Sequence, residues 1–356
     1  MPFPARLDNV LTDEPLMTAA IATAIVEAQA AFPSSLAPTQ AAFSIVAVDE
    51  STDPPLFSHG GLRHTEMHFS ASLLKVAAMY AAYQLRQSAN NFASSVADAT
   101  ADDLFNHMSA SFDPLIAPAV PLISNNPQIT QAMKVPKYRS VFAAVPLVDG
   151  GFALAFDAAF QNNMRQMIVP SDNNAASACI QALGYSWING VLASAGFFDP
   201  ATNTGIWLAG TFTEAFPRVR VASVNDGPVA QATTTSDLAN FYAHMFRHTL
   251  VDAGSSDEML ALLDDAAAGP DSSWMVRAGI APADLSFGVT GTKIGLGPLK
   301  PENGGFDVAS EGTIVQHLAT GRKFIVVWQN CRDDGNSLAA CALTVNRAIN
   351  IFLGVP

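Results

Sequence analysis

Apolar residues follow two kinds of pattern along this chain, and the change falls near residue 288. Before that point most apolar stretches have helical spacing, and after it they form short runs typical of buried strands. The patterns predict helices over 16–32, 72–87, 156–168 and 175–183, a helix capped at 233–236 that runs to about 250, and helices over 257–268 and 339–353. They predict strands over 42–48, 56–58, 288–296, 312–318 and 323–329.

Two stretches have no clear periodicity. Residues 88–155 contain several Pro and Asn residues that interrupt helices. Residues 185–231 are rich in Gly, so we expect loops there. The remaining elements predict one sheet with a helical lobe inserted into it. The sheet lobe would comprise residues 16–80 and 250–356 and the helical lobe residues 81–249, with an active site in the cleft between them.

Composition narrows the class of protein. The 356 residues are 49% hydrophobic and 14% charged, which is enough apolar material for a large folded core. The net charge of −13 argues against nucleic-acid binding, which needs a basic surface. No apolar run is long enough to span a membrane. The first residues show no export signal, so we expect an extracytoplasmic location only if a signal peptide has been removed.

The first motif that could carry chemistry is Ser72-Leu73-Leu74-Lys75. A serine hydroxyl is a weak nucleophile until a base takes its proton. Residues three apart on a helix share one face, so Lys75 could be that base for Ser72 if burial and a neighbouring cation lowered its pKa. The alternative is that Ser72 only caps a helix and Lys75 is a solvated lysine.

Two further motifs follow along the chain. Ser171-Asp172-Asn173 precedes a predicted short helix, and it could be a plain helix cap as well as a functional group. Lys293-Ile294-Gly295 lies on a predicted strand, where Lys293 would supply the neighbouring cation. Gly295 would allow a substrate backbone to lie close to that strand.

In this order and spacing the three motifs resemble those of the penicillin-recognising serine enzymes, the class A β-lactamases and D,D-peptidases (penicillin-binding proteins). The resemblance covers roughly residues 16–356. It implies an α/β (α+β) fold, an antiparallel sheet flanked by helices with an inserted all-helical lobe. The long separation of the first two motifs marks residues 88–145 as an insertion or a rebuilt part of that lobe.

The resemblance also implies a role for each motif residue. Ser72 would attack a carbonyl and Lys75 would take its proton. Ser171 and Lys293 would assist proton movement and hold the substrate, and Asn173 would bind both Lys75 and the substrate.

The same family pattern implies further groups around the substrate. The backbone N–H groups of Ser72 and Leu296 would form an oxyanion hole beside Gly295. The family usually has Thr or Ser at the position of Ile294, where its hydroxyl helps to bind a substrate carboxylate. Glu214 is the candidate for activating a deacylating water, with a plain surface glutamate as the alternative.

These motifs predict a serine acyl hydrolase that acts on an amide, ester or lactam in a small-molecule or peptide-like substrate, without a cofactor. A D,D-peptidase, a class A-like β-lactamase and a non-hydrolytic acyl-binding sensor remain alternatives. The pairs His64/His68 and His244/His248 have the spacing of metal ligands on a helix, which leaves a metal hydrolase as a third class. Cys331 and Cys341 could form a disulfide in an exported protein.

Overall fold

The computed structural model describes residues 2–35, 40–148, 150–213, 216–225, 230–269, 286–299 and 307–355. The chain forms two compact units. The first comprises Met1–Leu7, Lys75–Val221 and Val229–Gln231, and the second comprises Asp8–Leu74, Ala222–Pro228 and Ala232–Pro356. The sequence analysis set the lobe boundaries at 81 and 249, whereas the main unit boundaries lie at 75 and 232.

The second unit is built on a six-stranded sheet. In sheet order its strands are β1 (Leu11–Asp13), β3 (Leu56–Leu62), β2 (Ala42–Asp49), β13 (Lys323–Arg332), β12 (Asp307–His317) and β11 (Phe287–Pro298). Neighbouring strands are antiparallel except for the parallel pair β1 and β3. The sheet flanked by helices confirms the predicted fold class.

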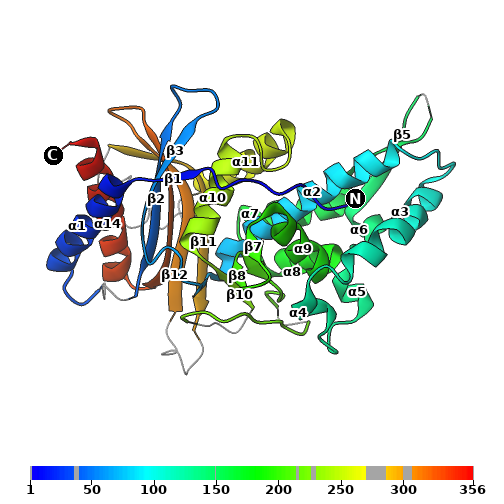
Figure 1. Cartoon of the computed structure of the whole chain (residues 1–356), viewed down its shortest axis with the longest axis horizontal. Helices are drawn as coiled ribbons and strands as arrows, with labels where there is room; N and C mark the ends of the chain where they lie inside the picture. The colour runs from blue at the N-terminus through cyan, green and yellow to red at the C-terminus, as the bar shows by residue number, and fades with distance from the viewer. Residues whose placement is uncertain are drawn as a thin grey trace. The chain divides into compact units, whose positions relative to one another are not determined.

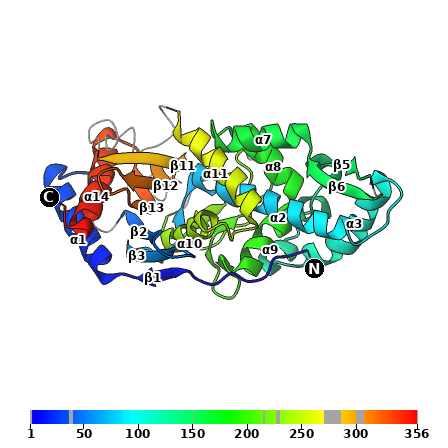
Figure 2. The same ribbon diagram turned by 90° about the horizontal axis from the view of Figure 1, so that it is seen from above.

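Helices cover both faces of this sheet (Figure 1). They are α1 (Pro15–Ala31), α14 (Gly335–Leu353), α10 (Thr235–Phe246) and α11 (Ala253–Ala267). Helices α1 and α14 lie side by side on one face, and α10 and α11 lie on the other (Figures 1 and 2). Because both faces are covered, the central strands β2 and β13 are buried along almost their whole length, which explains their continuous apolar runs.

The first unit is mainly helical. Its helices are α2 (Lys75–Ala93), α3 (Ala101–Ile116), α4 (Pro121–Ser124), α5 (Gln131–Lys134), α6 (Tyr138–Val141), α7 (Ala158–Ile168), α8 (Asn173–Leu183) and α9 (Tyr185–Ala195). Its strands are the hairpin β5 (Phe142–Pro146) with β6 (Phe152–Phe156), the pair β7 (Phe198–Asp199) with β8 (Thr204–Gly205), and β9 (Trp207–Leu208). The stretch 88–145 contains α3 to α6.

The prediction of loops over 185–231 was wrong at its start, where α9 forms a regular helix. Gly190 lies inside α9, and a Cβ there would come within 2.7 Å of the Phe3 ring. That ring stacks on Trp187 with centroids 5.4 Å apart. The glycine therefore permits close packing of an aromatic ring on the helix, and it does not interrupt the helix.

Two smaller elements of the second unit lead to the first motif. Strand β4 (His68–Phe69) pairs with Ala232 and Thr233 of β10 (Gln231–Thr233). The 3-10 helix η1 (Ala71–Leu74) follows at once and runs into α2. Among the described residues no helix is long and apolar enough to cross a membrane.

The three cysteines are free thiols and all are buried. Cys331 is a buried position near the end of β13, and its thiol donates to the Ser337 carbonyl at 3.3 Å. A hydrogen bond with Cys341 and burial raise the pKa of the Cys331 thiol well above its usual value. The two thiols that could have formed a disulfide thus lie together in reduced form.

Candidate active site

Lys75 is the first residue of α2 and is fully buried. Its ammonium donates to the Ser171 carbonyl at 2.6 Å, to the Asn173 Oδ1 at 2.8 Å and to the Ser171 Oγ at 3.2 Å. The Phe212 ring lies below the same nitrogen, 4.6 Å from Nζ to the ring centroid. The structure therefore brings Lys75 together with Ser171 and Asn173 within the first unit, including the expected contact of Lys75 with Asn173.

The second motif owes its position to the start of α8. Ser171 has φ of 62°, in the left-handed region that is uncommon for residues other than glycine. Asp172 caps the helix, because its carboxylate accepts from the Ala175 N–H at 2.7 Å. The motif is thus a helix cap, and its turn directs both oxygen atoms of Ser171 toward Lys75.

Burial sets the protonation state of Lys75. Loss of solvation lowers the pKa of Lys75 from 10.5 to about 7, and the negative charge of Asp172 opposes part of that shift. At neutral pH a substantial fraction of the Lys75 side chain is therefore the neutral amine, which can accept a proton. An ordinary solvated lysine has almost no neutral amine at that pH.

Ser72 lies in η1, in the second unit. The residue before it, Ala71, has φ of 47°. The third motif runs along this turn, because η1 packs against β11. A Cβ at Gly295 would lie 2.7 Å from the Leu73 nitrogen, and one at Gly297 would lie 3.3 Å from the Ala71 Cβ. Glycine at 295 is therefore needed for β11 to approach the Ser72 turn so closely, and glycine at 297 avoids a tight contact.

The other two residues of the third motif are held within the second unit. Lys293 is 2% exposed, and its Nζ donates to the Ile294 carbonyl at 3.1 Å. The Ile294 side chain packs against the apolar core between the sheet and α1 and α14. An isoleucine at this position therefore contributes to the core.

The histidine pairs do not form metal sites in the described part of the chain. His64 lies in a turn and His68 in β4, so the first pair shares no helix. The two ring nitrogens of His244 contact Thr249 Oγ1 at 2.9 Å and the Asp8 carbonyl at 2.8 Å. Across the described residues no three His, Cys, Asp or Glu side chains gather to hold a metal ion.

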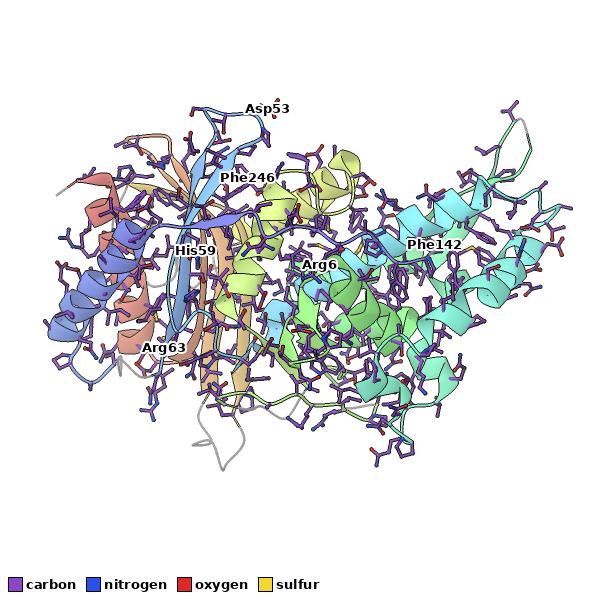
Figure 3. The ribbon with its side chains drawn as sticks, viewed as in Figure 1. Arg6, Asp53, His59, Arg63, Phe142 and Phe246 are labelled. Atoms are coloured by element: carbon purple, nitrogen blue, oxygen red, sulfur yellow. The ribbon has the colours of Figure 1, made fainter. Side chains whose placement is uncertain are left out.

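A serine–histidine pair lies inside the sheet, apart from the three motifs. His59, labelled on β3 in Figure 3, has its Nε2 3.0 Å from Ser44 Oγ, which donates to Thr235 Oγ1 at 3.0 Å. Burial, followed by the nearby His64, lowers the pKa of His59 to about 4, so the ring is neutral. Ser44 has no exposed surface. This network links β3 and β2 to the start of α10 and gives a substrate no access to the serine.

Comparison with known proteins agrees with this geometry. Residues 157–327 match the model of the Beta-lactamase2 family, described as the beta-lactamase enzyme family. The structure is similar to a β-lactamase from Sphaerobacter thermophilus DSM 20745, with 15% identity, a TM-score of 0.50, and 95% of this chain and 98% of that one covered. The family match confirms the predicted resemblance to β-lactamases over residues 157–327, and the structural likeness shows the fold.

Two other solved structures show the same β-lactamase-like fold. A class A β-lactamase representative from Bacteroides cellulosilyticus DSM 14838 is 13% identical, with a TM-score of 0.52 and coverage of 94% of this chain and 98% of that one. A β-lactamase from Burkholderia phymatum is 14% identical, with a TM-score of 0.52 and coverage of 93% and 99%. No curated protein matches the chain in sequence.

Glu214 lies outside the described residues of this β-lactamase-like chain. The nearest described residues on either side of it, Thr213 and Phe216, form hydrogen bonds. Thr213 donates to Ser177 Oγ of α8 through its N–H at 3.1 Å and its hydroxyl at 3.0 Å. On the other side the Phe216 N–H donates to Thr211 Oγ1 at 3.4 Å. The role of Glu214 in deacylation remains a prediction.

The sequence analysis missed four residues around these motifs. Phe212, which lies under Lys75, gave no signal in the sequence. Ser70, Ser310 and Gln329 surround the turn before Ser72 and are fully or almost fully buried. Gln329 directly follows the apolar run of β13, and that polar position was an available signal, whereas Ser310 lies among other polar residues of β12 and gave none.

Proposed function

We propose that this β-lactamase-like hydrolase acts as a serine acyl hydrolase on an amide, ester or lactam through an acyl-enzyme on Ser72. The observation that carries the proposal is the buried Lys75. Its pKa is lowered to about 7, and it begins the helix directly after the turn that contains Ser72. A buried lysine whose hydrogen bonds to described residues go to the oxygen atoms of Ser171 and Asn173 is suited to accept the proton that Ser72 must lose.

The contacts of Lys75 also support a proton relay through Ser171. The charged ammonium has three donors, whereas the neutral amine has two donors and one lone pair. The Ser171 carbonyl and the Asn173 Oδ1 can only accept, so they take the two donors of the neutral amine. The lone pair is left to take the proton of Ser72, and the ammonium that this forms donates to the Ser171 hydroxyl oxygen, 3.2 Å away. Ser171 is thus placed to return a proton to a leaving group.

The strand β11 supports the proposed oxyanion hole. Leu296 lies between Gly295 and Gly297, and both glycines approach the turn that contains Ser72. As an edge strand, β11 has alternate backbone N–H groups that β12 does not use. We assign the N–H groups of Ser72 and Leu296 to the developing oxyanion, and Lys293 to substrate binding and proton movement.

The fate of the acyl-enzyme separates the alternatives. A hydrolase needs a base that activates water, and Glu214 is our candidate for it. Slow deacylation would give the behaviour of a D,D-peptidase inhibited by penicillin, and absent deacylation that of an acyl-binding sensor. Because Ile294 brings no hydroxyl to the carboxylate-binding position, a substrate without a carboxylate at that place is also compatible with the site.

Intact-protein mass spectrometry after incubation with a penicillin, and separately with a p-nitrophenyl ester, tests the proposal. We expect a mass increase equal to the acyl group on the wild-type protein and none on Ser72→Ala. Consumption of the compound by wild type alone, without a lasting adduct, would mean efficient deacylation. Equal labelling or equal consumption by Ser72→Ala would refute Ser72 as the nucleophile.

A further inference from the structure

We propose that Ser310 and Gln329 are positioning residues that fix Ser72 for acylation by holding Ser70 from two strands of the sheet. We call Ser70, Ser310 and Gln329 the Ser70 clamp. The inference rests on the proposed function of Ser72 as the nucleophile. It adds two residues that lie outside the three motifs.

The Ser70 clamp binds both the backbone carbonyl and the side-chain hydroxyl of Ser70. Ser310 Oγ donates to the Ser70 carbonyl at 2.8 Å, and Gln329 Nε2 donates to the Ser70 Oγ at 2.7 Å. The Ser70 hydroxyl in turn donates to the His68 carbonyl at 3.0 Å. The Ser70 carbonyl also accepts from the Leu73 N–H at 3.1 Å, which closes the turn around Ser72. Backbone and side chain of Ser70 are therefore both fixed.

The two donors come from the interior of the sheet. Ser310 belongs to β12 and Gln329 to β13, which are interior strands. Ser310 pairs in register with Gly295 on the edge strand β11, so one residue contacts both sides of the proposed oxyanion hole. A Cβ at Gly295 would lie 2.5 Å from the Ser310 Oγ. Ser310 thus sets the distance between the Ser72 turn and β11.

Fold stability alone gives a poor account of Gln329. The side chain has no exposed surface, and its Oε1 has no hydrogen-bond partner among the described residues. A buried amide with one unsatisfied oxygen is unfavourable for folding, so an apolar side chain of similar size would serve the sheet better. What the amide provides here is the N–H that fixes the Ser70 hydroxyl.

Backbone strain next to Ser72 shows why a clamp is needed. Ala71 has φ of 47°, a conformation that a residue with a Cβ adopts only when its surroundings impose it. If the contacts on Ser70 are lost, Ala71 can relax and the Ser72 Oγ and N–H move with it. A displacement of about 1 Å from the productive geometry is enough to slow an enzyme about 100-fold.

The test compares Ser310→Ala and Gln329→Leu with Thr313→Val. Thr313 is a matched control, because it is buried on the same strand β12 and its hydroxyl donates to the Gly291 carbonyl at 2.9 Å, away from Ser70. A fluorophosphonate probe labels the serine, and the dependence of the labelling rate on probe concentration gives a probe dissociation constant and an acylation rate constant. Melting temperatures and hydrogen exchange of residues 68–76 are measured on the same proteins.

We expect Ser310→Ala and Gln329→Leu to lower the acylation rate constant by about 10- to 100-fold, with the probe dissociation constant unchanged. Thr313→Val should lose a similar amount of thermal stability and keep the acylation rate. In a Ser70→Ala background, Gln329→Leu should slow acylation no further, because Ser70→Ala already removes the hydroxyl to which Gln329 donates. Wild-type acylation rates in both clamp variants, or equal slowing in Thr313→Val, would overturn the proposal.

Failure of the proposed function has a different signature. If no probe labels Ser72 of the wild-type protein, the assignment of Ser72 as the nucleophile fails. Hydrogen exchange is then the remaining test of whether the Ser70 clamp holds the turn. If residues 68–76 exchange faster than in wild type in Ser310→Ala but at the wild-type rate in Thr313→Val, the clamp holds this turn. Unchanged exchange in Ser310→Ala and Gln329→Leu would overturn the clamp as well.

Discussion

Replacing Lys75 with methionine should alter how the stability of this protein depends on pH. The pKa of Lys75 falls from 10.5 in the unfolded chain to about 7 in the folded one, mainly through burial. A group that binds its proton more weakly when folded disfavours folding below the folded pKa. That penalty disappears as pH rises from about 7 to 10.5.

The size of the effect follows from the same shift. Each pKa unit corresponds to about 1.4 kcal/mol, so the full penalty at low pH is about 5 kcal/mol. It is about 4 kcal/mol at pH 7 and about 1 kcal/mol at pH 10. Relative to Lys75→Met, the wild-type free energy of unfolding should therefore rise by about 3.5 kcal/mol between pH 7 and pH 10.

Urea unfolding followed by circular dichroism at pH 7, 8, 9 and 10 measures this difference. Groups that titrate in both proteins cancel when the two pH profiles are subtracted. Lys134→Met serves as the control for loss of one lysine, because the Lys134 ammonium donates to the Ser124 carbonyl, away from the motifs. Parallel profiles for wild type and Lys75→Met would refute a depressed pKa at Lys75, and with it the proposal that Lys75 is the base.

Three further predictions concern the reaction and the turn. The acylation rate of Ser72 should rise with pH through an apparent pKa of about 7, since only neutral Lys75 accepts the proton. Asp172→Asn keeps the helix cap but removes the charge that raises the Lys75 pKa, so it should move this rise to lower pH. A pH profile that does not move in Asp172→Asn would contradict the assignment of Lys75 as the base. Gly295→Ala should cost about 1–3 kcal/mol in unfolding experiments and abolish labelling of Ser72, because its Cβ would overlap the neighbouring turn, whereas Gly335→Ala, with open space around its Cβ, should leave both unchanged. Glu214→Gln should make the acyl-enzyme accumulate in mass spectra without slowing its formation, and unchanged turnover would exclude Glu214 as the deacylation base.

The hydrophobic pattern determined most of the secondary structure. The continuous apolar run of β13 requires cover on both faces, and the structure places that strand in the sheet interior. The Gly-rich composition of residues 185–231 predicted loops, so helix α9 was missed together with Gly190 inside it. The partner of Gly190 is the Phe3 ring, far away in the sequence, and no local pattern contains that contact.

The candidate site residues were proposed from sequence alone, because the spacing and order of the motifs were informative. Sequence could name Ser72, Lys75 and Asn173, but it could not give the pKa of Lys75. That pKa depends on how completely other parts of the chain exclude water from the ammonium.

Tertiary structure alone decided what surrounds the motifs. Ser310 and Gln329 meet Ser70 across 240 and 259 residues of sequence, and Ile294 turns its side chain into the core of the sheet unit. Such contacts depend on strand order and register, which couple distant segments and leave only a faint trace in local sequence, here a polar residue directly after an apolar run. Residue types and spacing therefore determined the candidate chemistry, and long-range packing determined the environment in which that chemistry would operate.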